Sequence, residues 1–243
     1  MNDKNDLAGQ TVVVIGGTLG IGLETARLAR AEGAKVIITA RDLDRLQRVG
    51  LELGASVASF DATDFVRLEK FFNEIPGQID HVLVTGPGPY YSPLAEFDFD
   101  KARRDIEAHL FMPIQVARCA TKKVRPGGAL LFMSGTGGRR TAKGLVLISS
   151  LTAAGGALTR NLALELAPIR VNSIAAGFVD TPLSETLLGD QIDARREQLR
   201  TTLPIHRVVG PKDIAALAIH LMKNTAVTGA TFDIDGGQQL VEG

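Results

Sequence analysis

A cluster of glycines follows directly after the first β-like apolar run of the sequence, Thr11–Ile15. A tight turn between a strand and a helix needs residues without Cβ atoms, because only then can backbone N–H groups approach phosphate oxygens. A helix that begins near Gly20 would also direct the positive end of its dipole at these oxygens. A turn that only packs a strand against a helix is the alternative, but this position between a strand and an amphipathic pattern is the one that dinucleotide binding requires. The residues predicted to hold a pyrophosphate are Gly16, Thr18, Leu19, Gly20, Ile21 and Gly22.

Short apolar runs typical of buried strands alternate along the chain with longer helical patterns. The predicted strands are Thr11–Ile15, Lys35–Ala40, Ser56–Phe60, His81–Thr85, Ala129–Met133, Arg170–Ala175 and Ala230–Ile234. The predicted helices include one from about Gly20 and others at Phe65–Ile75, Lys101–Lys122, Val146–Ala167 and Lys212–Met222. Strands that are apolar on both sides predict a parallel sheet with helices on both faces and right-handed crossovers. The fold class is therefore α/β: a Rossmann-type doubly wound parallel sheet in a single domain over residues 1–243, with its ligand crevice at the carboxyl ends of the strands.

A long polar segment, Pro182–Pro204, separates the strand predicted at Arg170–Ala175 from the helix predicted at Lys212–Met222. Insertions of this length within a compact domain commonly carry function, and this one leaves the sheet on the crevice side. We predict that it forms a lid.

The composition excludes several classes of function. Hydrophobic residues make up 45% and charged residues 22% of the 243 residues, which is typical of a globular protein. The 27 basic residues equal the 27 acidic ones, so net charge predicts no nucleic acid and no membrane partner. One cysteine, Cys119, excludes an intramolecular disulfide and a multi-cysteine metal site, and no metal is expected. The polar start Met1–Gly9 does not have the pattern of a secretory signal, so a cytoplasmic location is expected.

Several motifs together resemble the short-chain dehydrogenase/reductase family, and the resemblance covers almost the whole chain. The glycine turn fits the family pattern Thr-Gly-x-x-x-Gly-x-Gly over Ile15–Gly22, except that Ile15 replaces the threonine. The other matching segments are Asp61–Asp64, Leu162–Leu166, Gly177–Thr181 and Asp233–Gly237. The resemblance implies a nicotinamide cofactor. It also implies that Asp61 and Ala62 contact the adenine and that Thr85 and Gly86 lie along the cofactor. Gly177, Val179 and Thr181, in the matching segment Gly177–Thr181, are expected to contact the cofactor as well.

The residue after the second predicted strand discriminates between the two nicotinamide cofactors. An acidic residue there would accept hydrogen bonds from the ribose hydroxyls and repel a 2′-phosphate. This sequence has Ala40 followed by Arg41, and a guanidinium can form charge-assisted hydrogen bonds to a phosphate. NADP(H) is therefore favoured over NAD(H). The alternative is that Arg41 is a solvated surface charge, in a field weakened by Asp42 and Asp44.

The family's acid/base motif, Tyr-x-x-x-Lys, is absent from this chain. Counting back from Thr159-Arg160, which matches a family segment, places Thr152 at the lysine position and Ile148 at the tyrosine position. The family serine falls on Gly135 and the family asparagine on His109. The sequence contains only two tyrosines, Tyr90 and Tyr91, and the residues four positions beyond them are Leu94 and Ala95. No alignment register can therefore restore the motif.

Other groups could move a proton in place of this pair. An unperturbed imidazole titrates near neutral pH, and His109 is expected to face the crevice, although a structural histidine bonded to backbone is the alternative. Ser134 could hold a substrate oxygen, as could Thr136, and both could also simply end a strand. Tyr90 and Tyr91 could donate a proton or form an aromatic wall. The predicted catalytic residues are His109 and Ser134.

Three functions remain open on the sequence. The first is an NADP(H)-dependent oxidoreductase that acts on an unknown carbonyl or alcohol, a small-molecule substrate, with a non-standard acid/base site. The second is a catalytically inactive NADP(H)-binding sensor or subunit, and the third is a non-redox lyase or isomerase that reuses the crevice. The resemblance also implies a homodimer or homotetramer, formed by the helices predicted at Lys101–Lys122 and Val146–Ala167.

Overall fold

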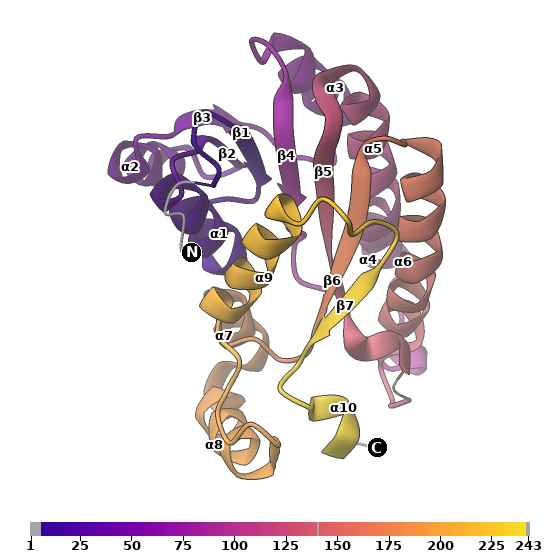
Figure 1. Ribbon diagram of the computed structural model, residues 1–243. Helices are drawn as coiled ribbons and strands as arrows, with labels where there is room; N and C mark the ends of the chain where they lie inside the picture. The colour runs from indigo at the N-terminus through magenta and orange to yellow at the C-terminus, as the bar shows by residue number, and fades with distance from the viewer. Residues whose placement is uncertain (1–5, 140, 242–243) are drawn as a thin grey trace.

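Seven parallel strands form one sheet in the order β3-β2-β1-β4-β5-β6-β7, within residues 6–139 and 141–241 that this computed structural model describes (Figure 1). The strands are β1 Thr11–Ile15, β2 Lys35–Ala40, β3 Ser56–Ser59, β4 Ile79–Val84, β5 Val124–Gly135, β6 Arg170–Ala176 and β7 Thr231–Ile234. The strand order reverses between β1 and β4, which places a crevice at their carboxyl ends. The predicted doubly wound parallel sheet is confirmed.

Helices cover both faces of this sheet, and the alternation of β1 side chains shows why. Val12 and Val14 belong to a core that also contains residues of α1 and α9, whereas Val13 and Ile15 belong to a core with residues of α3 and α5. A strand buried on both sides must be apolar where it is buried, as Val12, Val13, Val14 and Ile15 are. The bounds of these and the neighbouring helices are α1 Gly20–Ala31, α2 Leu43–Leu53, α3 Phe65–Glu74, α5 Met112–Lys123, α6 Val146–Glu165 and α9 Pro211–Lys223. None of the described helices is long and apolar enough to cross a membrane.

The helix predicted at Lys101–Lys122 is divided into three parts. α4 spans Phe99–Ile106, a π-helical turn η2 follows at Glu107–Phe111, and α5 begins at Met112. Pro113 explains the change, because a proline in a helix has no N–H to donate and its ring clashes with the carbonyl four residues earlier, here that of His109. π-Helical turns occur frequently at functional sites.

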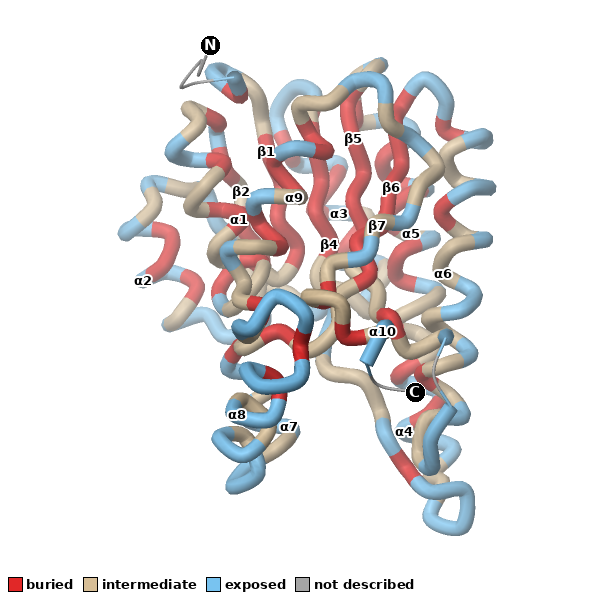
Figure 2. The backbone as a smooth tube through the Cα atoms, turned by 60° about the horizontal axis from the view of Figure 1, so that its bottom comes forward, coloured by how far each residue is buried: buried red, intermediate tan, exposed pale blue. Residues whose placement is uncertain are grey.

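The insertion predicted as a lid is helical. It contains α7 Pro182–Leu188, the short 3-10 turn η4 Gly189–Gln191 and α8 Ile192–Thr202. These elements project beyond the carboxyl ends of the strands (Figures 1 and 2). A parallel bridge between Val179 and Val209 brings the two ends of the insertion together. The remaining short elements are η1 Leu94–Glu96, η3 Thr136–Arg139 and α10 Gln238–Val241.

Candidate cofactor and catalytic site

A cleft of about 1100 Å³ lies at the carboxyl ends of β1, β2 and β4. It extends from the glycine turn past the end of β2 to the loop after β4, to α4, and to the base of the lid. The predicted cofactor contacts that line it are Gly16, Thr18, Leu19, Gly20, Ile21, Gly22, Arg41, Asp61, Ala62, Thr85, Gly86 and Thr181. Gly177 and Val179 do not line this cleft, although they lie a few residues before Thr181 on the same segment.

The glycine turn is shaped so that its backbone can approach a ligand. Gly16 has φ +87°, and a Cβ atom there would lie 2.1 Å from the Thr85 hydroxyl oxygen. A Cβ atom on Gly22 would lie 2.1 Å from the carbonyl oxygen of Gly16. The helix that starts here, α1, receives no side-chain hydrogen bond from its N-cap Leu19, so its first N–H groups remain available to an anion. This turn fits the pyrophosphate of a dinucleotide cofactor.

Thr85 ties the loop after β4 to the glycine turn. The resemblance to short-chain dehydrogenases implies such a tie from a threonine at the position of Ile15, and the apolar side chain of Ile15 cannot make it. Here the Thr85 hydroxyl donates to the carbonyl oxygens of Ile15 at 2.9 Å and Gly16 at 3.2 Å, and the Thr85 N–H donates to Ile15 as well. The glycine turn and the loop after β4 are therefore hydrogen-bonded to each other, with the donor on the loop after β4.

Two arginines stand at the end of the cleft next to β2. The Arg41 guanidinium lies 3.7 Å from Asp61, and that of Arg45 lies 3.0 Å from Asp42. Asp61 also accepts hydrogen bonds from the Thr63 N–H and hydroxyl. Partial burial would raise the pKa of Asp61, but these hydrogen bonds and the Arg41 charge outweigh it and hold the pKa below its ordinary value. Sequence reasoning missed Arg45. The only sign of it in the sequence was its position, about one helical turn after Arg41.

His109 lies directly behind the wall of the cleft, on the π-helical turn. Its Nδ1 is 3.0 Å from both the carbonyl oxygen and a carboxylate oxygen of Asp105, and its Nε2 is 3.3 Å from the Pro87 carbonyl oxygen. Burial would lower the pKa of His109, but the hydrogen bond and charge of Asp105, with the backbone carbonyls, outweigh it and raise the pKa. Asp105 is 6% exposed and accepts the Tyr90 N–H with the same oxygen, while its other carboxylate oxygen has no hydrogen-bond partner among the described residues. Sequence reasoning did not find Asp105.

The two tyrosines follow β4 in the loop that forms this wall. Tyr90 lines the cleft, its hydroxyl oxygen accepts the Asp98 N–H at 2.8 Å, and its ring packs on Phe97. Burial, with the Asp105 charge, raises the pKa of Tyr91, which opposes loss of its proton. The geometry of Tyr90 is that of a wall residue.

Ser134 lies apart from His109. It lines a second pocket of about 340 Å³, between β5, β7 and α6, together with Gly135 and Thr152. The Thr152 hydroxyl donates to the carbonyl oxygen of Ile148, within its own helix. Ile148, at the family's tyrosine position, is 8% exposed, and Thr136 is buried. No group of three or more acidic, histidine or cysteine side chains that could hold a metal occurs among the described residues.

Comparison with known proteins places these features in one family. The sequence profile described as enoyl-(acyl carrier protein) reductase matches residues 16–239. The short-chain dehydrogenase/reductase ATR9 of Stachybotrys chlorohalonatus is 31% identical over 255 residues, covering 96% of this chain and 98% of the relative. The chain belongs to the short-chain dehydrogenase/reductase family.

Solved structures of the family agree with the fold. The MalC reductase/Diels-Alderase of Malbranchea aurantiaca superposes with a TM-score of 0.89 at 25% identity, covering 98% of this chain and 99% of the other. A small-chain dehydrogenase in complex with NADPH gives a TM-score of 0.82 at 28% identity, covering 96% and 99%. As a family member, this chain is an oxidoreductase by descent, and its sequence contains no Tyr-x-x-x-Lys motif.

Proposed function

We propose that this protein is an NADP(H)-dependent oxidoreductase that acts on a small carbonyl or alcohol substrate with a non-standard acid/base site. The observation that carries the proposal is the cleft itself. It joins a glycine turn without room for side chains, a helix N-terminus with available N–H groups, and the guanidinium groups of Arg41 and Arg45. The NADPH complex of a family member with the same fold supports the choice of cofactor.

Different residues of the cleft would bind different parts of the cofactor. The N–H groups around Gly20 and Ile21 would hold the pyrophosphate, and the two arginines would exchange their carboxylate partners for a 2′-phosphate. The bound cofactor supplies hydride chemistry, so the protein has to orient a substrate and manage one proton. Asp105 favours the charged form of His109, and the Nε2–H of this histidine can pass a proton towards the cleft when the contact with Pro87 opens.

A binding titration tests the cofactor assignment. NADPH fluorescence should change on binding at micromolar protein, and the Arg41→Ala/Arg45→Ala double variant should weaken NADPH binding by about tenfold while leaving NADH binding unchanged. Arg48→Ala, a further exposed arginine on α2 outside the cleft, is the matched control and should bind NADPH like the wild type. Absence of NADPH binding to the wild type would contradict the proposal.

Turnover tests the redox assignment separately. NADPH consumption with a panel of aldehydes and ketones should be lost in His109→Ala at unchanged cofactor affinity. Binding without any turnover would favour the inactive sensor or subunit instead.

A non-redox activity of the same cleft is the second candidate. It is favoured by the missing tyrosine and lysine, together with the similarity to a protein described as both reductase and Diels-Alderase. Conversion of a substrate without oxidation of NADPH would support it.

A further inference from the structure

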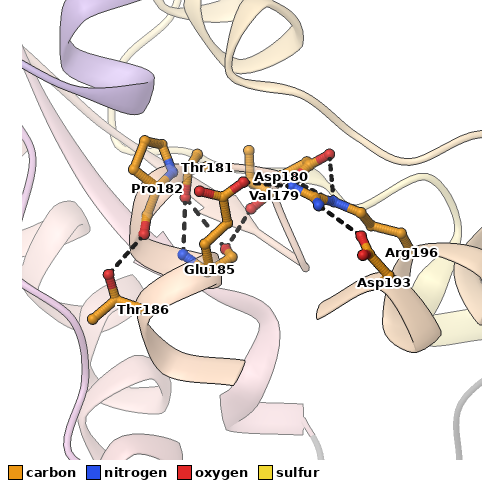
Figure 3. A network of polar contacts seen from close by, with 9 residues as sticks. Val179, Asp180, Thr181, Pro182, Glu185, Thr186, Asp193 and Arg196 are labelled. Carbon is orange, nitrogen blue, oxygen red and sulfur yellow. Dashed lines mark hydrogen bonds and ion pairs between the residues drawn. The ribbon is translucent and has the colours of Figure 1, made fainter. Parts of the chain in front are cut away.

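Arg196 joins three parts of the lid through one guanidinium (Figure 3). Its Nε and Nη2 donate to the Asp180 carboxylate at 2.7–3.1 Å. Nη2 also donates to Glu185 at 2.7 Å, and Nη1 donates to Asp193 at 2.9 Å. Asp180 lies at the base of the lid, Glu185 on α7, and Asp193 on α8 beside Arg196 itself. The Arg196 side chain is 21% exposed, so these charge-assisted bonds are partly shielded from water.

The two ends of the insertion are in turn held together, between the end of β6 and the start of α9. The Asp180 N–H donates to the carbonyl oxygen of Val209 at 2.9 Å, next to the bridge between Val179 and Val209. A bidentate contact from Arg196 to Asp180 therefore ties α8 to the paired ends of the insertion, where Val179 and Val209 are buried in the core.

Thr181 connects this base to the cofactor cleft. It lines the cleft, is 9% exposed, and caps α7 by accepting the Ser184 N–H with its hydroxyl oxygen. Its methyl group rests on the phosphate-binding turn, because a Cβ atom added to Gly20 would lie 3.3 Å from it. Asp180 is the residue directly before Thr181, so the position of one limits the position of the other.

The far side of α7 closes against the opposite wall of the cleft. Leu183 lines the cleft, and a Cβ atom on Gly88 would lie 2.8 Å from a methyl carbon of Leu183 and 3.7 Å from one of Leu187. The lid therefore rests directly on the backbone of the loop after β4. Rotation of α7 away from this loop would open the cleft, and Gly189, with φ +50° and no atom within 4 Å of a Cβ position, separates α7 from the next turn.

We propose that Arg196 is a positioning residue that holds α7, α8 and Thr181 closed over the cofactor cleft, and so slows release of the cofactor. This inference rests on the proposed function for its ligand. The contact is selective for arginine, because an ammonium group cannot donate to Asp180, Glu185 and Asp193 in one planar fork. Loss of the contact lowers the population of the closed lid, and apparent cofactor affinity falls with that population.

Stopped-flow dissociation of NADPH from the full chain tests the proposal. Arg196→Met should raise the dissociation rate constant by about fivefold while the association rate constant changes little. Asp180→Asn should act in the same way, and Arg196→Lys should give an intermediate rate. Arg200→Met is the matched control, because Arg200 pairs only with Glu197 on its own helix in the described structure and should release NADPH like the wild type.

Two readouts separate this role from general loss of stability. A misfolded fraction would reduce the amplitude of the binding signal but would leave the dissociation rate of the remaining protein unchanged. Hydrogen exchange of α7 and α8 without cofactor should increase in Arg196→Met and not in Arg200→Met. Unchanged exchange or an unchanged dissociation rate in Arg196→Met would overturn the proposal. If the wild type does not bind NADPH, the proposed function fails, and the exchange measurement alone still decides whether Arg196 holds the lid.

Discussion

The imidazole of His109 lies between acceptor oxygens on both sides. Nδ1 faces two oxygens of Asp105 and Nε2 faces the Pro87 carbonyl. A neutral imidazole has one nitrogen without a proton, which would oppose an acceptor in either tautomer. The charged form satisfies both sides, and it also neutralises the buried Asp105 carboxylate. His109 therefore holds the cleft wall at Pro87.

This arrangement predicts a stability that decreases as pH rises. Because the folded pKa of His109 lies above its ordinary value of 6.5, its contribution is complete below pH 6.5 and is lost as pH rises through the folded pKa. His109→Gln should remove this part of the pH dependence. Melting temperatures of both proteins from about pH 6 to about pH 9 measure it, since unperturbed histidine titrates in this range. Parallel curves for the two proteins would contradict the assignment.

The burial of His81 predicts that the stability of the folded protein decreases as pH falls. His81 is 2% exposed on β4, its Nε2 contacts Gln10, and its Nδ1 has no partner among the described residues. Burial, with the positive charge of Arg170, lowers the pKa of His81 to about 4. The unfolded chain takes up the proton near pH 6.5 and the folded protein does not, so stability present above pH 6.5 is lost as pH falls towards 4.

The size of this loss is measurable. Between about pH 6.5 and about pH 5 the free energy of unfolding should fall by about 2 kcal/mol. His81→Gln should lose less over the same interval in urea unfolding experiments. An equal loss in both proteins would show that other groups cause the acid sensitivity.

At the residue scale, the sequence predicted which residues line the cleft better than it predicted their hydrogen-bond partners. The need for glycines at positions 16 and 22 could be predicted, because a tight turn between a strand and a helix restricts the local backbone. The role of Asp105 could not be predicted, because it depends on the contact with His109 one helical turn later. The charge of that histidine is not evident from the sequence. Thr85 was expected along the cofactor. The hydrogen bond from its hydroxyl to the carbonyl oxygen of Ile15 was not predicted, because it joins segments far apart in the chain.

At the scale of elements, the predicted starts of α3 and α6 are confirmed and the bounds of α9 are correct to within one residue, whereas α2 was not predicted. β1 and β2 agree with the sequence in both bounds. The π-helical turn could not be seen in the apolar pattern, because a proline near the start of a helix looks the same as one that interrupts a longer one. The helices of the lid were missed because α8 is largely polar and packs few residues into the core.

Arg170 joins β6 to the end of α9 and predicts a large loss of stability on substitution. It is 5% exposed and donates to the carbonyl oxygens of Leu221, Met222 and Asn224, which end that helix. Arg170→Met would leave these buried acceptors unsatisfied, at a cost of about 3 kcal/mol in the free energy of unfolding.

Urea unfolding provides the measurement for Arg170. The matched control is Arg207→Met, which removes an exposed pair with Asp213 and should lower the free energy of unfolding far less than Arg170→Met. Similar losses in the two variants would mean that the carbonyl contacts of Arg170 contribute little.

At the scale of the whole molecule, the alternation of buried strands and helices was sufficient to predict the sheet. Strands that are apolar on both faces can be satisfied only between two helical layers, which limits the topology. The closure of the lid on the loop after β4 could not be predicted, because it depends on where Leu183 meets a glycine at position 88.

The long helix α6 predicts that the protein forms a homo-oligomer. Of its 20 residues only Ile148 and Thr159 are buried, and α6 is tan and pale blue along most of its length in Figure 2. Leu164 is 79% exposed, although helices of such apolar composition are normally covered. Light scattering after size exclusion should give at least a dimer for the wild type, and Leu164→Arg should shift it to the monomer. Leu51→Arg on α2, where the leucine is 86% exposed, is the matched control and should leave the mass unchanged. A monomeric wild type at micromolar concentration would show that the surface of α6 is not an interface between copies.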